Sequence, residues 1–240
     1  MRGNSKMVLV FAAACLLCAG AAMADTLAVN NTAAMGGTGT ACGGSNCGLE
    51  ITHDNADTAF VQDDSPAAES IYRATFLYNP ASITTTANYR QTIFNAVGDN
   101  PNPGGGVCPG GAFVSSFRCF GYQTGGAGQN SSVQCFVRGN QCGEAAVTRI
   151  GVTENDPVRV CVEWSTGNAL SGMIALAVVD DQDPCPPTGD PAYNTRNVTN
   201  GNTNVQFIRL GTSQTNGFGA GETASYYFDE FASFRTLAGM

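Results

Sequence analysis

Hydrophobic and polar positions alternate along most of the chain in short segments that Gly, Asn, Asp and Pro residues separate. A spacing of two residues predicts β-strands, because successive side chains of a strand point to opposite faces. After residue 24, no stretch of ten residues combines helical periodicity with helix caps. We therefore predict an all-β protein, with strands at 48–52, 58–62, 70–79, 91–97, 112–122, 132–139, 145–152, 157–165, 172–180, 205–212 and 224–235.

Two of these segments indicate how the strands are buried. In 157–165, the three valines and Trp164 face one side, so this only tryptophan is expected to anchor the core. A sugar-stacking platform is the alternative for its ring. Segment 172–180 is apolar on both faces, which is typical of a strand that is covered on both sides. The pattern favours a sandwich or a barrel.

The first 24 residues have the features of a secretory signal. Arg2 and Lys6 precede the apolar run MVLVFAAACLLCAGAA, and Ala22-Met23-Ala24 provides a site for signal peptidase. No later segment is apolar over the length that a membrane span needs. We predict that the mature chain begins at Asp25, does not insert into a membrane, and is secreted or periplasmic.

The charge balance limits the chemistry that is available. The chain has 11 Lys and Arg against 19 Asp and Glu; without the two basic residues of the signal, 9 against 19 gives a net charge of −10. All nine remaining basic residues are arginines. Such a chain is not expected to carry a basic patch for nucleic acid or anionic lipid. It has no lysine for a Schiff base, and its one histidine, His53, is expected to be a solvated loop residue.

The cysteines predict a disulfide-bonded protein. Of the 10 cysteines, two lie in the signal, and the even number that remains favours disulfides in an exported chain. Structural zinc is the alternative, but the chain after the signal has no C-x-x-C pair and only one histidine. Pairing between neighbours in the sequence predicts the bonds Cys42–Cys47, Cys108–Cys119, Cys135–Cys142 and Cys161–Cys185.

The chain after the signal is expected to form one domain. Gly-rich stretches lie next to cysteines, which indicates stapled loops rather than interdomain linkers. We expect a Gly-rich N-terminal segment at 25–47, a single β-sandwich at 48–236 and a short tail at 237–240.

Five segments, in this order, resemble the concanavalin A-like lectin/glucanase jelly roll, close to its laminin-G-like branch and to secreted bacterial relatives. They are YRATFLYNP (72–80), VRVCVEW (158–164), SGMIALAVVDD (171–181), VQFIRLGT (205–212) and YYFDEFASFR (226–235). The resemblance covers residues 48–235. It implies two antiparallel sheets with disulfide-stapled loops, and a closing strand that pairs beside the opening strands.

The acids of the closing strand bear on catalysis. Period two places Asp229 and Glu230 on opposite faces, with Phe231 on the side of Asp229. A retaining glycosidase needs its two carboxyl groups about 5 Å apart. Glucanases of the resembled fold carry E-x-D-x-E or E-x-D-x-x-E, and this chain has neither spacing. We therefore predict that Asp229 is a structural acid, partly buried and hydrogen-bonded, and that the chain is not an enzyme.

The resemblance also suggests binding sites. Laminin-G-like and legume-lectin-like members often hold calcium, and an acidic turn provides candidate ligands at Asp180, Asp181 and Asp183; a solvated turn is the alternative. No other cofactor is expected. Exposed aromatic rings near loops can stack on sugars. The candidates for that role are Tyr78, Tyr89, Tyr122 and Tyr193.

These observations predict a secreted, non-catalytic binding domain for glycans or surface polymers. A structural or adhesive extracellular protein without a small-molecule ligand is the alternative. A glycoside hydrolase ranks third, because the acid spacing is missing.

Overall fold

A computed structural model describes the chain at residues 27–30, 33–35, 49–53, 58–64, 66–84, 89–98, 114–123, 131–140, 143–168, 170–201, 203–213, 215–216 and 223–235. Every regular element in these ranges is a β-strand, so the all-β prediction is confirmed. The same ranges contain no helix of the length and apolar character that would cross a membrane. The predicted signal lies outside the described residues.

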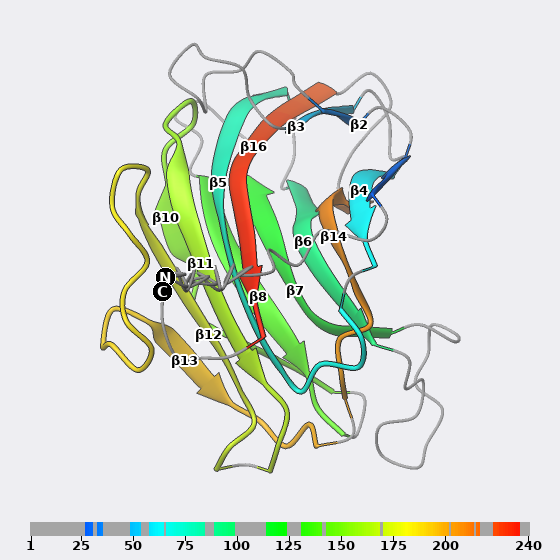
Figure 1. Ribbon diagram of the computed structural model, residues 1–240. Coiled ribbons are helices and arrows are strands. Elements are labelled where there is room, and N and C mark those ends of the chain that lie inside the picture. Colours follow the sequence, from blue (N-terminus) through cyan, green and yellow to red (C-terminus); the bar gives the residue numbers. More distant parts are fainter. Residues whose placement is uncertain are drawn as a thin grey trace, which may run out of the picture.

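The strands form two antiparallel sheets that pack face to face (Figure 1). Sheet A has the order β1-β4-β14-β6-β7-β8-β10, with β15 beside β6 and β9 beside β8. Its strands are β1 (Leu27–Asn30), β4 (Ala59–Asp63), β14 (Phe207–Thr212), β6 (Tyr89–Gly98), β7 (Val114–Gln123), β8 (Ser131–Arg138), β10 (Ile150–Val152), β15 (Thr215–Asn216) and β9 (Glu144–Ala146).

Sheet B has the order β13-β12-β11-β5-β16-β3-β2. Its strands are β13 (Asn194–Asn197), β12 (Met173–Asp180), β11 (Val158–Ser165), β5 (Ile71–Thr84), β16 (Thr223–Phe234), β3 (Leu49–His53) and β2 (Ala33–Met35). The closing strand β16 pairs with both β3 and β5, as the jelly-roll resemblance implies. The sandwich prediction is therefore confirmed in its architecture.

The sequence pattern located most strands but not all of them. The predicted strand 145–152 is two short strands, β9 and β10, which pair with different parts of β8. Strands β1, β2, β13 and β15 were not predicted. They have two to four residues each, too few to show an alternating pattern.

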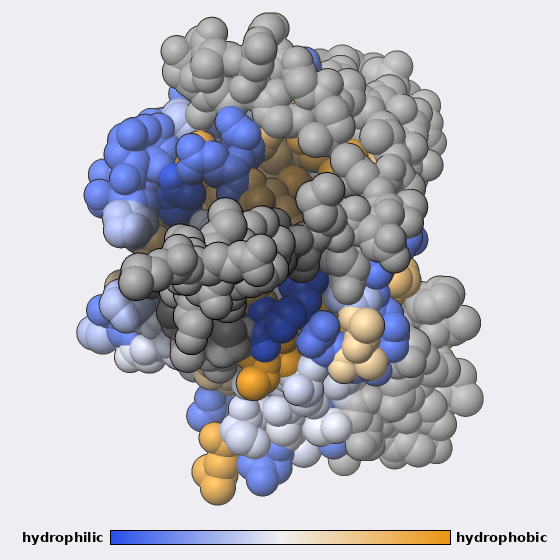
Figure 2. Space-filling model, in the orientation of Figure 1, coloured by the Kyte–Doolittle hydropathy of each residue, from blue (hydrophilic) through white to orange (hydrophobic). Residues whose placement is uncertain are grey.

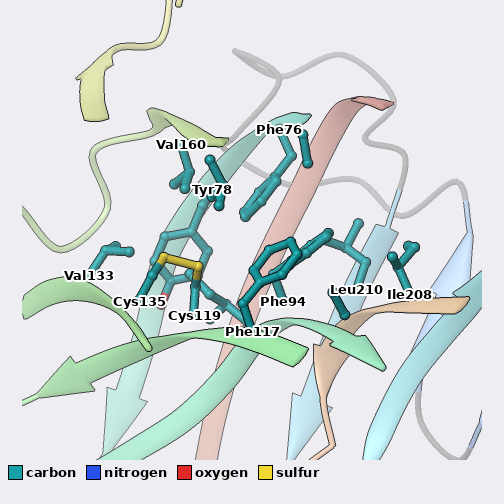
Figure 3. Close-up of a cluster of buried hydrophobic side chains, with 14 of the residues drawn as sticks. Phe76, Tyr78, Phe94, Phe117, Cys119, Val133, Cys135, Val160, Ile208 and Leu210 are labelled. Carbon is teal, nitrogen blue, oxygen red and sulfur yellow. A yellow bond between two sulfur atoms is a disulfide. The ribbon is translucent and has the colours of Figure 1, made fainter. Parts of the chain in front are cut away.

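The core lies between the sheets and combines stacked aromatic rings with aliphatic side chains (Figure 3). Phe94 stacks on Phe76 of the facing sheet and on Phe117 of its own sheet. Trp164 is fully buried and stacks on Phe117, with 5.6 Å between the ring centroids. The prediction that Trp164 is a core anchor agrees with this placement.

Two disulfides are present among the described residues. Cys161–Cys185 has the predicted partners, whereas Cys119 bonds to Cys135. The predicted bonds of Cys119 to Cys108 and of Cys135 to Cys142 are therefore wrong. The two half-cystines lie directly opposite each other on β7 and β8, so strand register brings them closer than sequence neighbours. Residues Cys42, Cys47, Cys108 and Cys142 lie outside the described ranges.

Strand β12 is covered on both faces, as its sequence predicted. One face packs in the core, and the other lies beneath the loop 181–193, which we call the strap. Ala175 and Ala177 pack there with Cys161 and Tyr193. The surface over the strap, at the left of the view, is mostly hydrophilic (Figure 2). The strap therefore forms a polar cover on sheet B.

A β-bulge in β16 changes the placement of the two acids. The register with β5 shifts between Asp229 and Ala232, and Glu230 has a positive φ of 49°. Period two fails across a bulge, so Phe231 packs on the core and stacks with Phe94. The prediction that Phe231 shares a face with Asp229 is wrong. Asp229 is partly buried and accepts a hydrogen bond from the backbone N–H of Glu230 at 2.8 Å. Its role as a structural acid stays a prediction.

Candidate functional site

The outer face of sheet A gathers basic side chains that the sequence spreads over more than a hundred residues. Alternation along β6, β7, β8 and β14, together with cation–π contacts, places five arginines on this surface, which we call the arginine face. They are Arg90, Arg118, Arg138, Arg149 and Arg209. Composition did not indicate this grouping, because net charge does not record where the charges lie. That the chain has no basic patch for nucleic acid or anionic lipid stays a prediction.

Strand register aligns part of this face into one row across the sheet. Arg209 of β14 lies opposite both Gln62 of β4 and Asn95 of β6, and Asn95 lies opposite Arg118 of β7. Phe136 of β8 continues the row beyond Arg118. Neighbouring strands are about 4.8 Å apart, so the backbones at Arg209 and Arg118 are about 10 Å apart. The row is a polar track perpendicular to the strands.

Aromatic rings hold the guanidinium groups of this face. Arg90 and Arg118 both lie over Phe120, at 5.1 and 5.0 Å from the ring centroid. Arg149 lies 3.8 Å from the centroid of Tyr122, and its Nε donates to Gln134 at 3.1 Å. Such stacking orients the cations without neutralising them.

Arg209 is stacked in the same way, and no carboxylate of the described residues lies within ion-pair distance of it. It lies 4.4 Å from the centroid of Phe60 and 5.1 Å from that of Phe207, and its Nε donates to Gln62 at 2.8 Å. Among described residues, it forms no ion pair with a carboxylate. Such a guanidinium remains available to an anion.

The acids on the arginine face neutralise only part of its charge. Glu144 binds Arg118 at 2.8 Å and Arg138 at 3.6 Å. Burial lowers the pKa of Arg138, an effect that Glu144 opposes, and burial likewise lowers the pKa of Arg209, which Asp64 opposes. A partly desolvated guanidinium group is stabilised when an anion binds to it, because the anion replaces the lost interactions with water.

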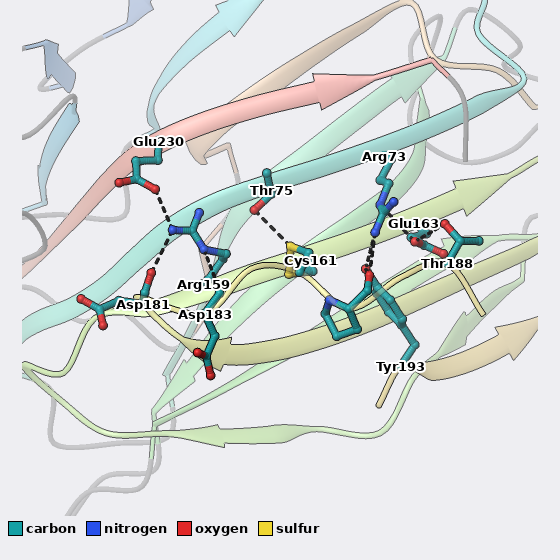
Figure 4. The surroundings of a disulfide bond; sticks show 12 residues. Arg73, Thr75, Arg159, Cys161, Glu163, Asp181, Asp183, Thr188, Tyr193 and Glu230 are labelled. Atoms are coloured by element: carbon teal, nitrogen blue, oxygen red, sulfur yellow. Dashed lines mark hydrogen bonds and ion pairs between the residues drawn. A yellow bond between two sulfur atoms is a disulfide. The ribbon is translucent and has the colours of Figure 1, made fainter. Parts of the chain in front are cut away.

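The outer face of sheet B differs, because the strap closes it (Figure 4). Arg73 of β5 and Glu163 of β11 form an ion pair at 3.0 Å, with side chains only 2% and 1% exposed. Arg73 also donates to the carbonyl of Pro186 at 2.8 Å and to the hydroxyl of Tyr193 at 3.1 Å. Thr188 donates to Glu163 at 2.9 Å. The Arg73–Glu163 pair attaches the strap to sheet B. Because both side chains are buried, a substrate cannot reach them.

Burial, opposed by the hydrogen bond from Arg73, raises the pKa of Tyr193 to about 12. An unfolded chain ionises tyrosine near pH 10, so the neutral phenol stabilises the fold fully below pH 10. We expect this contribution to be lost as the pH rises through 12. The difference in tyrosinate absorbance between wild type and Tyr193→Phe should have its midpoint near pH 12. A midpoint near 10 would mean that the strap leaves the phenol in solvent.

The acidic turn after β12 binds an arginine of the chain itself. Arg159 donates to the backbone carbonyls of Asp181 and Asp183, each at 2.8 Å, and pairs with Glu230 at 2.7 Å (Figure 4). A guanidinium therefore occupies carbonyl oxygens that calcium would use. In the described part of the chain, no three His, Cys, Asp or Glu side chains converge as a metal site. Calcium at Asp180, Asp181 and Asp183 stays a prediction that no contact supports.

The four tyrosines proposed to stack on sugars do not come together. Tyr78 and Tyr89 point into the core and are 1% and 2% exposed. Tyr193 is the last residue of the strap and packs against sheet B, and Tyr122 lies on the arginine face beneath Arg149. Only Tyr122 is therefore near a candidate binding surface. The sequence did not indicate the arginines, because a shared register between distant strands is what groups them.

Comparison with solved structures relates this fold to polysaccharide lyases. The endo-β-1,4-glucuronan lyase of the fungus Trichoderma reesei matches with a TM-score of 0.54 and 14% identity, over 89% of this chain and 92% of that chain. A marine alginate lyase of Aplysia kurodai has a TM-score of 0.51 and 10% identity, over 79% and 83% of the two chains. An alginate lyase of Pseudomonas aeruginosa has a TM-score of 0.50 and 11% identity, over 78% and 82%. The chain has their jelly-roll fold. No protein-family model and no curated protein matches the sequence.

These structures correct the predicted function. The expectation of a non-catalytic binding domain, and of a chain that is not an enzyme, is contradicted by matches to polysaccharide-cleaving enzymes over most of the chain. The prediction was wrong because the spacing of the acids bears on only one mechanism of glycan cleavage. A missing pair of carboxylates excludes glycoside hydrolysis by that pair, but it says nothing about elimination.

Proposed function

We propose that this protein is a lyase for an acidic polysaccharide and that the arginine face of sheet A is its binding and catalytic surface. The observation that carries the proposal is the row Gln62–Arg209–Asn95–Arg118–Phe136. The lyases that share the fold support the reaction class, since glucuronan and alginate are polymers of uronic acids.

Elimination at a uronate suits the residue types on this face. A base removes the proton at C5, the C4–O4 bond breaks, a C4=C5 double bond forms, and the leaving oxygen takes up a proton. The C5 proton is acidic only when the charge on the adjacent carboxylate is neutralised, and guanidinium groups do this through two parallel hydrogen bonds. No pair of catalytic carboxylates and no lysine is required.

The row would bind a polymer that lies across the strands. Arg209 would receive one carboxylate, and Arg118 would bind a second in exchange for Glu144, which it pairs with in the free protein. Asn95 between them would contact a hydroxyl. Phe136 at the end of the row offers an apolar ring for a sugar face. Arg90 lies opposite Tyr122 and Arg149 stacks on its ring, so these two guanidinium groups would bind the carboxylate of the uronate that reacts.

Tyr122 is our candidate for proton transfer. It is the tyrosine of the arginine face among the described residues, and Arg149 and the neighbouring Phe120 fix its ring. A phenol can donate a proton to the leaving oxygen and, as phenolate, accept the C5 proton.

We expect the purified protein to release unsaturated oligosaccharides from a polyuronate, measured by the ultraviolet absorbance of the C4=C5 bond. Arg118→Ala and Arg209→Ala should each lower kcat/KM by roughly 10²-fold, because each removes a cation that holds the polymer in register with Tyr122. Tyr122→Phe should lower kcat by about 10²–10⁴-fold, since it removes the proton-transfer group but keeps the ring.

Arg196→Ala is the matched control, because Arg196 is an exposed arginine on β13 of sheet B. It should leave kcat/KM unchanged, and thermal unfolding should confirm that each variant is folded. If the Arg118→Ala and Arg209→Ala variants are folded and fully active, the active site does not lie on the arginine face. Absence of unsaturated product from glucuronan, alginate and polygalacturonate alike would overturn the lyase proposal itself.

We also propose that the chain belongs to the concanavalin A-like jelly rolls and is exported by its first 24 residues. The five resembling segments correspond to β5, β11, β12, β14 and β16, in the expected order. The two disulfides are compatible with an oxidising compartment. Acidic glycans are the partners that this location and the arginine face would suit.

A further inference from the structure

A polar cluster lies inside the sandwich, where hydrophobic side chains would be expected. Tyr89, Gln123 and Ser131 lie opposite one another in one row across β6, β7 and β8, and Gln91 lies in the next row opposite Gly121. All four polar residues are at most 3% exposed. They belong to the inner face, because Tyr78 reaches across from sheet B to the position above Gly121.

The tyrosines of this cluster come from both sheets. The hydroxyl of Tyr89 on sheet A is 2.7 Å from that of Tyr226 on sheet B, so one donates to the other. The hydroxyl of Tyr78 and the amide nitrogen of Gln91 both approach the place where a side chain of Gly121 would be. No charged side chain takes part in these contacts, so the cluster is uncharged.

Several polar atoms here have no partner among the described residues. Both amide atoms of Gln123, the Oε1 of Gln91 and the Oγ of Ser131 are buried without a hydrogen bond. A buried amide that gives up its hydrogen bonds to water without replacing them lowers the stability of the folded protein. Three such side chains in adjoining positions are therefore not a stable arrangement unless something else binds them.

We propose that this cluster is an internal binding site for ordered water, enclosed between β6, β7 and β8 of sheet A and the tyrosines of sheet B. Water suits the site because it both donates and accepts. The amide of Gln123 offers two donors and an acceptor, and the hydroxyls of Ser131 and Tyr78 offer both functions. The bound water completes the hydrogen bonding of one end of the sandwich and links its two sheets.

The site does not depend on the proposed lyase activity. Gln91 and Gln123 point into the core, whereas their sequence neighbours Arg90 and Tyr122 belong to the arginine face on the other side of sheet A. Loss of activity and loss of internal water are therefore separate results.

Two measurements test the proposal. A high-resolution crystal structure of the wild-type protein should show water within hydrogen-bonding distance of the Gln123 amide and of Ser131 Oγ. Urea unfolding should show that Gln123→Met, which keeps the length of the side chain and removes its polar atoms, lowers the unfolding midpoint, because the bound water loses partners.

Gln182→Met, on the exposed strap, is the control and should not change the midpoint. If the cluster is dry, Gln123→Met removes an unsatisfied amide, and the midpoint should rise instead. A raised midpoint, or a wild-type crystal structure without density between these side chains, overturns the proposal. The crystal structure decides alone if Gln123→Met does not fold.

Discussion

Glu163→Ala is expected to lower the free energy of unfolding by about 3–5 kcal/mol, because it leaves the buried Arg73 guanidinium without its carboxylate partner. The change also removes the acceptor for Thr188, so the strap loses an attachment. Chemical denaturation measures the loss. Proteolysis within 181–193 should accelerate as well, because a released strap becomes a substrate for the protease.

An exposed ion pair provides the matched control. Glu230→Ala breaks the Arg159–Glu230 pair, whose glutamate side chain is 57% exposed, and should change the stability by less than about 1 kcal/mol. The double variant Arg73→Met/Glu163→Leu should recover most of the loss, since apolar residues replace both buried charges. Equal effects of Glu163→Ala and Glu230→Ala would contradict the burial of the Arg73–Glu163 pair.

Trp164→Ala should destabilise the protein by about 3–5 kcal/mol and leave a cavity between the two sheets. The indole is fully buried and stacks on Phe117 at the centre of the aromatic core. Thermal and urea unfolding measure the loss. The native fluorescence of this only tryptophan should be blue-shifted and insensitive to iodide.

Two further variants test whether the loss of stability comes from the missing ring at position 164 or from mutation in general. Trp164→Phe should be milder than Trp164→Ala, because the indole N–H has no hydrogen-bond partner among the described residues. Leu170→Ala, at a position 92% exposed, should lie within about 0.5 kcal/mol of wild type. A red-shifted, iodide-quenched native emission would place Trp164 outside the core.

The candidate site could not be predicted from the sequence, although every residue in it is visible there. Arg209 and Arg118 are separated by 91 positions (209 − 118), and nothing local to either indicates that they share a row. The net charge of the chain even argued against a basic surface. A sheet sorts side chains by face and register, so an acidic protein can still present a basic face.

Local order was decided by the sequence itself. Alternation of apolar and polar residues along a strand determines which side chains face inward, and this placed β11, its Trp164, and the doubly covered β12 correctly. Tertiary structure decided what depends on pairing between distant strands. Register joined Cys119 to Cys135, a bulge turned Phe231 into the core, and the strap buried Arg73 with Glu163. These features depend on contacts between segments far apart in the chain, whose register is set only when the two sheets pack together.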